Sequence, residues 1–191
     1  MVFETHVPVA EKVLSVSDPD AGFIAKGQRV PVIGYKPQVA RSGAGFVTGL
    51  LLPQGNAADS GQLVPMLEEV VRRTTVTPSV VSVDDGYASQ ANVDTLRQRH
   101  VEVISINGAK GRALTARADW TRDDYAEARD LCSAVESLIF TLKQGFDFGY
   151  VARRGLAPAH GEWLEKALAY NICRMVRKRR ADDATAHADA A

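Results

Sequence analysis

Two short apolar runs, separated by a helical segment, place the strongest constraint on the fold. Residues 80–83 (VVSV) and 101–106 (VEVISI) have the composition of strands, and residues 89–99 between them are expected to form a helix. A strand, a helix and a second strand in this order predict a parallel pair joined by a right-handed crossover. Because residues 80–83 are almost entirely apolar, we predict that they form a fully buried central strand.

An antiparallel hairpin and a helix are predicted before this parallel unit. Residues 30–40 and 46–52 have strand composition, and the glycine-containing loop between them favours a reversal of the chain. A helix is expected to follow and to end near Arg73, with Asp59 or Ser60 as its N-cap residue.

Two further helices complete the expected order of elements. The helix over residues 123–143 has apolar residues at spacings of three and four, which predicts a face buried in the core. These apolar residues are Leu131, Val135, Leu138 and Leu142. The final helix, over residues 160–178, has a similar predicted inward face, formed by Leu164, Leu168, Ile172 and Val176. The whole order predicts an α/β fold with a mixed sheet flanked by helices.

The length of the chain and the distribution of its charges indicate one principal domain. At 191 residues the chain can bury its own core, and its 23 basic and 23 acidic residues give no overall charge that attracts nucleic acid or membrane. We predict a partial N-terminal segment at residues 1–17, a main domain at residues 18–180 and a disordered tail at residues 181–191. The main domain ends in a cationic block, residues 174–180.

The cysteines and histidines argue against a disulfide fold and a zinc site. Cys132 and Cys173 lie on separate predicted helices, without the spacing of metal ligands. Two such thiols suit a reducing compartment. The four histidines are scattered, and no apolar run has the length of a membrane span. We therefore expect a cytoplasmic protein.

Two carboxylates stand at positions where an α/β fold can build a metal site. Asp84 directly follows the strand at residues 80–83, and ligands collect at the carboxyl ends of strands. Glu136 lies on a predicted helix with Arg129 about two turns before it and Lys143 about two turns after it. Such carboxylates suit Mg²⁺ or Mn²⁺ and phosphoryl transfer. Taken singly, these residues are more commonly an ordinary Asp-Gly turn and a solvated charged stripe, and it is the combination of Asp84 with Glu136 that favours a metal site.

Several phrases, in this order, resemble the catalytic core of a bacterial insertion-sequence transposase of the DDE group. The family's Asp-x-Gly-Tyr motif matches Asp84, Gly86 and Tyr87, and its helix Glu and the Lys seven positions later match Glu136 and Lys143. The phrases are GYKPQVARSGAGFVTGLLLPQGNAADS, VDDGYAS and SAVESLIFTLKQGFDFGYVARRGL. The resemblance implies a ribonuclease-H-like fold, a mixed sheet flanked by helices.

The chain departs from the family pattern at two places within the resemblance, which covers about residues 18–179. The family has an Arg four positions before the Glu, where this chain has Cys132; Arg129, one turn earlier, is a partial substitute. The family's first Asp lies on a strand upstream of the hairpin, and residues 1–17 contain no Asp.

The absent first Asp leads to an expectation about the extent of the chain. Asp18 and Asp20 come first in the sequence, but they lie in a proline-containing loop where this group has an additional acidic segment. We expect that the first strand and its Asp precede Met1 and that the chain is a truncated transposase.

The resemblance implies a DNA transposase that uses metal ions to cut transposon ends and join them to target DNA. Asp84 and Glu136 are the expected catalytic residues and hold Mg²⁺ or Mn²⁺. The expected DNA contacts are Lys143, Arg129, Arg153 and Arg154. The implied partners are transposon-end and target DNA and another copy or a full-length transposase, in the bacterial nucleoid. Without the first Asp, we expect the chain alone to be weak or inactive.

Three alternatives are open. A chain that keeps a DNA-binding surface but lacks a metal ligand is a non-catalytic remnant or an inhibitor of a full-length transposase. A ribonuclease-H-like nuclease cuts DNA without joining strands. A plain α/β binding module holds Asp84 and Glu136 far apart.

Overall fold

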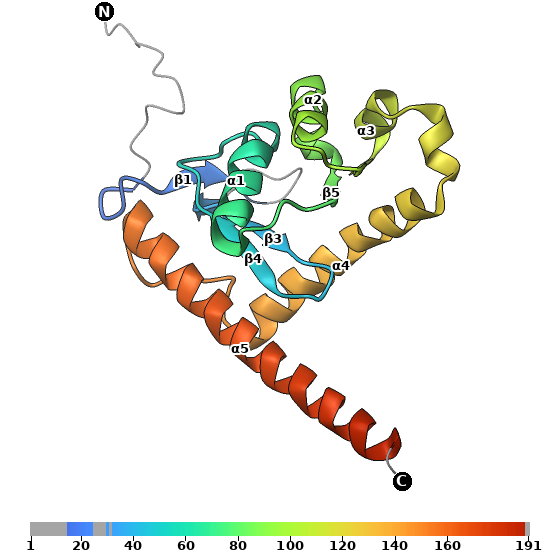
Figure 1. Cartoon of the computed structure of the whole chain (residues 1–191). Helices are drawn as coiled ribbons and strands as arrows, with labels where there is room; N and C mark the ends of the chain where they lie inside the picture. Colours follow the sequence, from blue (N-terminus) through green and yellow to red (C-terminus); the bar gives the residue numbers. More distant parts are fainter. Residues whose placement is uncertain (1–14, 25–29, 31, 190–191) are drawn as a thin grey trace, which may run out of the picture.

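The computed structural model of the protein describes residues 15–24, 30 and 32–189 (Figure 1). Most of the predicted N-terminal segment, residues 1–14, lies outside the described residues. The strands are β1 (Gly22–Ile24), β2 (Val32–Gly34), β3 (Gln38–Arg41), β4 (Val47–Leu51), β5 (Val80–Asp84) and β6 (Val103–Asn107). The α-helices are α1 (Leu63–Thr74), α2 (Gln90–Gln98), α3 (Ala109–Leu114), α4 (Asp123–Gly145) and α5 (Leu156–Asp189). Short 3-10 turns are η2 (Asp59–Gln62), η3 (Asp85–Tyr87) and η4 (Arg117–Thr121).

The described strands form three separate two-stranded sheets, not the single mixed sheet that we expected. The predicted strand over residues 30–40 divides into β2 and β3, since Pro37 interrupts it. β2 pairs antiparallel with β1, and β3 pairs antiparallel with β4, as the hairpin prediction requires. β5 and β6 form the predicted parallel pair, in register from Val80 opposite Val103 to Asp84 opposite Asn107.

The parallel pair is joined by α2, as expected from the order of elements. The hydroxyl of Ser89 accepts a hydrogen bond from the Asn92 backbone at 3.1 Å and so caps the start of α2. Leu96 of α2 and Ile106 of β6 are fully buried. The prediction that β5 is fully buried is wrong: Val80 is 37% exposed, and Asp84 at the other end is also exposed. The reason is that no described strand pairs with the second edge of β5.

The main core forms where α4 and α5 pack against β4. It contains Leu50, Leu138, Leu142 and Trp163, and the Trp163 indole donates a hydrogen bond to the Phe148 carbonyl at 3.0 Å. For α4, the predicted inward face is confirmed at Leu138 and Leu142, which are buried.

The other half of the predicted α4 stripe lies outside this core. Leu131 is 37% exposed and Val135 is half-buried. Both side chains line a groove instead, because the described residues place no apolar layer over them.

The final helix is longer than predicted, and a different face of it packs against the core. Leu164 is half-buried and packs against the core as predicted, but Leu168, Ile172 and Val176 are exposed, because the buried face is formed by Ala159, Trp163, Ala167 and Tyr170. α5 continues to Asp189 through residues predicted as a disordered tail, and its alanines favour a helix there. Its C-terminal half projects away from the other elements (Figure 1). No helix in the described part of the chain is long and apolar enough to cross a membrane.

The core position of Leu142 generates a stability prediction. Leu142→Ala removes a completely buried side chain, so we expect it to lower the free energy of unfolding by about 2–5 kcal/mol. Urea denaturation followed by circular dichroism measures the change. Leu168→Ala, at a position 60% exposed, is the matched control, and its effect should stay within about 0.5 kcal/mol. Equal effects of the two substitutions would contradict the assigned core.

Candidate active site

A groove of about 780 Å³ brings the two predicted catalytic carboxylates to one place. Asp84 reaches it from the carboxyl end of β5, and Glu136 reaches it from the middle of α4. Both residues are exposed. Residues of α1, of β3 and of the segment between α1 and β5 also line the groove. A strand end and a helix face thus each contribute an acidic group to the lining of one largely apolar hollow.

Cys132 contacts one of the two carboxylates and lies one helical turn before the other on α4. Its thiol donates a hydrogen bond to Asp84 Oδ1 at 3.2 Å. Burial raises the pKa of the Cys132 thiol to about 11, together with the hydrogen bond to Asp84 and the charges of Asp84 and Glu136, against a lowering effect of a hydrogen bond with Asn107. A thiol with so high a pKa is protonated at neutral pH, so Cys132 is no thiolate nucleophile. The thiol therefore contacts Asp84 directly, and the charge of Glu136, one turn later on α4, also acts on it.

The loop that carries Asp84 is tied to the hairpin by a chain of hydrogen bonds. The Tyr87 phenol donates to Gln38 Oε1, and Gln38 Nε2 donates to Asp59 Oδ1 at 3.0 Å. Asp59 also forms an ion pair with Lys36 at 2.7 Å. Burial and the charges of Asp59 and Asp84 raise the pKa of the Tyr87 phenol, which therefore remains a donor. This series of hydrogen bonds fixes the end of β5 relative to β3.

The same contacts correct the prediction for Asp59. Asp59 begins η2, and no side-chain hydrogen bond caps that turn or α1 within the described residues. Its carboxylate instead turns toward Lys36 and Gln38, where a full positive charge offers a stronger partner than a backbone amide.

Of the two adjacent acidic residues, Asp85 has a structural role. Its Oδ1 accepts a hydrogen bond from the backbone N–H of Gly111 at 2.9 Å, in α3, the helix that follows β6. Gly108 has φ +138, and a Cβ there would come within 2.4 Å of Asp85. Asp85 therefore holds α3 in place, and Asp84 is the residue that lines the groove.

Asn107 is a site residue that the sequence analysis missed. It ends β6 directly opposite Asp84, and its Nδ2 donates to the Arg129 carbonyl of α4 at 3.0 Å. Ser105 is hydrogen-bonded to Asn107 Oδ1 at 3.1 Å. The available signal was its place at the carboxyl end of the parallel neighbour of β5. Asn107 positions α4, and with it Cys132 and Glu136, beside the strand ends.

Asp18 and Asp20 do not supply a third carboxylate to the groove. Asp18 Oδ1 accepts hydrogen bonds from the Tyr35 phenol at 2.7 Å and from the Gly155 backbone at 3.1 Å. Asp20 Oδ2 accepts from the Leu156 backbone at 2.9 Å. Both carboxylates thus satisfy backbone donors at the start of α5, where the helix dipole favours negative charge. Within residues 15–24, 30 and 32–189, no cluster of three or more His, Cys, Asp or Glu side chains is arranged to hold a metal.

The four predicted DNA contacts are in two different states. Lys143 and Arg154 are exposed and make no hydrogen bond or ion pair with any other described residue. Arg153 is paired with Glu165 through two hydrogen bonds of 2.8 Å, and Arg129 lies 3.9 Å from Asp130. Exposed pairs of this kind contribute little stability, so a phosphate can replace the partner.

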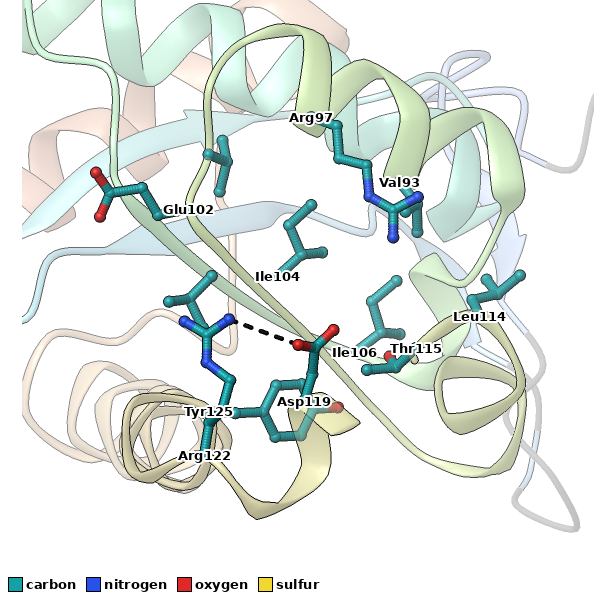
Figure 2. A pocket seen from close by; sticks show the side chains of 12 residues that line it. Val93, Arg97, Glu102, Ile104, Ile106, Leu114, Thr115, Asp119, Arg122 and Tyr125 are labelled. Carbon is teal, nitrogen blue, oxygen red and sulfur yellow. Dashed lines mark ion pairs between the residues drawn. The ribbon is translucent and has the colours of Figure 1, made fainter. Parts of the chain in front are cut away.

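A smaller cavity of about 90 Å³ lies between α2, β6 and the start of α4 (Figure 2). Figure 2 shows the side chains of Arg122 and Asp119 pointing toward each other in the lining of this cavity, and their ion pair measures 3.5 Å. Neither Asp84 nor Glu136 lines this cavity. Because the charges of Arg122 and Asp119 neutralise each other in this cavity, the larger groove, which both predicted catalytic residues line, is the better candidate for chemistry.

The raised pKa of Cys132 gives a direct test of the site's geometry. In a Cys173→Ser chain without metal, alkylation of Cys132 by iodoacetamide should rise with pH toward a midpoint of about 11, compared with about 8.5 for an ordinary thiol. Asp84→Asn should lower this midpoint, because it removes a negative charge and a charged acceptor. Mass spectrometry of the alkylated peptide measures both. A midpoint near the ordinary value in both chains would show that Asp84 and Cys132 are apart.

Comparison with known protein families identifies the family to which the chain belongs. A family model described as the transposase DDE domain matches residues 5–172. No curated protein and no solved structure gives a match. The matched range contains Asp84, Glu136 and every element that lines the groove. The resemblance recognised in the sequence is thereby confirmed: the chain belongs to the transposase DDE domain family.

Proposed function

We propose that Asp84 and Glu136 together hold Mg²⁺ or Mn²⁺ for phosphoryl transfer on DNA. The observation that carries this proposal is that both residues line one groove, where Cys132 is hydrogen-bonded to Asp84 and the charges of both carboxylates act on its thiol. Membership of the transposase DDE domain family supports it. The donor set also fits, because two exposed carboxylates offer hard oxygen ligands to a cation that keeps several of its waters.

The reaction that we propose is the cutting of transposon ends and their joining to target DNA. In the first step water attacks a DNA phosphate, and in the second the freed 3′ hydroxyl attacks the target. Asp84 and Glu136 would hold divalent ions, which would supply activation of the attacking oxygen and stabilisation of the leaving oxygen. Lys143 and Arg154 would offer their positive charges to DNA phosphates, with Arg129 and Arg153 as further contacts.

The finer fold that we propose is ribonuclease-H-like. The antiparallel pair β3–β4 and the parallel pair β5–β6 would belong to one mixed sheet, with the groove between them in place of a further strand. The network from Tyr87 to Gln38 supports this proposal, because it aligns the two pairs without any hydrogen bonds between strands.

We propose that the chain alone is weakly active or inactive. The described residues bring two carboxylates to the groove, and Asp18 and Asp20 are engaged at α5. The same observation favours a second candidate function, a non-catalytic DNA-binding remnant or an inhibitor of a full-length transposase. Its partners would be transposon-end and target DNA and another transposase copy, in the cytoplasm at the nucleoid.

Metal titration tests the proposed site independently of turnover. Isothermal titration with Mn²⁺ should show binding that Asp84→Asn or Glu136→Gln weakens at least about tenfold, since each removes a charged ligand. Asp130→Asn, an exposed neighbour on α4, is the matched control and should leave the affinity unchanged. Nicking of supercoiled plasmid in Mn²⁺ then separates weak catalysis from none. Equal affinities for all four chains would refute the metal site.

DNA binding by Lys143 and Arg154 can be tested through its dependence on salt concentration. Lys143→Ala and Arg154→Ala should each weaken binding to duplex DNA equally for all sequences. Each should also reduce the slope of log affinity against log salt concentration by about 0.9, the value for one phosphate contact. Arg72→Ala, at an exposed arginine already paired with Glu69, is the control. Fluorescence anisotropy at several salt concentrations measures the slopes. Unchanged slopes for both variants would remove these residues from the DNA interface.

A further inference from the structure

The outer face of α5 carries an apolar stripe that the core does not use. Leu168, Ile172, Met175 and Val176 are each between 40% and 60% exposed. The side chains that α5 buries, such as Trp163, lie on the opposite side of the helix. The outer face of a surface helix is normally polar, so a contiguous apolar stripe of this kind indicates a binding surface.

This stripe is arranged symmetrically about Ile172. Leu168 lies four residues before Ile172, and Val176 lies four residues after it. Glu165 lies seven residues before Ile172 and Arg179 seven residues after it, so the stripe has a negative charge at one end and a positive charge at the other. Because four and seven residues are close to one and two turns of an α-helix, all five side chains lie on one side of α5.

Both charges at the ends of the stripe can reach a partner. Arg179 is exposed and makes no hydrogen bond or ion pair with another described residue. Glu165 accepts two hydrogen bonds of 2.8 Å from Arg153, and both members of this pair are exposed. Such a pair contributes little stability, and a carboxylate has lone pairs for a second guanidinium. Glu165 can therefore bind a further cation without any change in the fold.

A second copy of the chain fits this pattern when its α5 runs in the opposite direction. Leu168 of each copy then lies against Val176 of the other, and the two Ile172 side chains meet at the centre. Glu165 of each copy faces Arg179 of the other. A parallel pair would bring like charges together at both ends, which is unfavourable. DNA or an anionic membrane fits less well, because both would repel Glu165.

The position of α5 in the molecule leaves room for an antiparallel pair. The N-terminal half of α5 packs on the core with the face opposite to the stripe, and the C-terminal half projects away from the other elements (Figure 1). In the pair, the projecting half of each copy lies along the packed half of the other, and the two cores stay on the outer sides. The paired segment, residues 165–179, is about 21 Å long.

We infer that the chain forms a symmetric dimer through antiparallel pairing of residues 165–179 of α5. The centre of the interface is apolar, and each end is closed by an ion pair between Glu165 of one copy and Arg179 of the other. This pairing needs neither metal nor DNA, so it goes beyond the proposed function. Either of the two can fail while the other stands.

Sedimentation velocity of the full chain over a range of concentrations tests the inference, and we expect a reversible equilibrium between monomer and dimer. Ile172→Glu places two carboxylates against each other at the centre of the pair, so it should weaken the dimer at least about tenfold. The fold should tolerate this substitution, because Ile172 is exposed in the monomer. Cys173→Glu adds the same charge to the same helix, about 100° away from the stripe. This matched control should leave the dimer unchanged.

Charge reversal at the two ends of the stripe tests the direction of the pairing. Glu165→Arg and Arg179→Glu should each weaken the dimer roughly tenfold, because each brings like charges together at both ends of an antiparallel pair. A mixture of the two variant chains should form the dimer again, since both ends of the mixed pair then join opposite charges. In a parallel pair a single reversal would leave like charges at both ends, as before, and would not weaken the dimer.

Four results would each overturn the inference. They are a chain that stays monomeric at every concentration, a dimer that Ile172→Glu leaves intact, a dimer insensitive to both charge reversals, and no recovery in the mixture. Leu168 is exposed only in the monomer, so the urea comparison with Leu168→Ala belongs at concentrations below the dimerisation range. The Mn²⁺ titration is a separate test of the metal site.

Discussion

The packing of α4 against both strand pairs is the interaction on which the rest of the structure depends. Near its start, Tyr125 and Ala128 pack with Val103 of β6, and near its end Leu138 and Leu142 enter the core beside β4 and α5. The strand pairs make no sheet with each other among the described residues, so α4 and the Tyr87 network set their relative position. The middle of α4 spans the groove between them. Cys132 and Glu136 lie on this middle stretch, and the same packing that builds the core therefore places Glu136 in the groove that Asp84 also lines.

Sequence patterns predicted which helices and strands form more accurately than they predicted which of their faces are buried. The spacing of Leu131, Val135, Leu138 and Leu142 correctly predicted a helix, but a spacing cannot say whether a partner covers each turn. The same holds for β5, whose apolar run suits burial on both faces although one edge is open. In α5 two apolar stripes compete, and the aromatic one with Trp163 and Tyr170 faces the core. Large aromatic side chains bury more area than Leu168 or Ile172, a difference that counting positions does not weigh.

Within the candidate site, residue types were predictable and their individual uses were not. The strand-end position identified the Asp84–Asp85 pair, but only the hydrogen bond from Gly111 assigns Asp85 to the fold and leaves Asp84 to the groove. The roles of Asp18 and Asp20 are decided by contacts with Gly155 and Leu156, more than a hundred residues away, and no local sequence pattern contains such contacts. Asn107 needed the register of β5 and β6. Long-range pairing decides such roles, and a single sequence does not reveal it.

In this transposase DDE domain, Asp84 and Glu136 line a single groove, and we propose above all that they form one metal site. Anomalous X-ray scattering from a crystal soaked in Mn²⁺ tests this most directly, because it locates the ion without reference to activity. We predict an anomalous peak in contact with carboxylate oxygens of both residues, in the groove beside Cys132. A peak bound by only one of them, or Mn²⁺ bound elsewhere with this position empty, would contradict it.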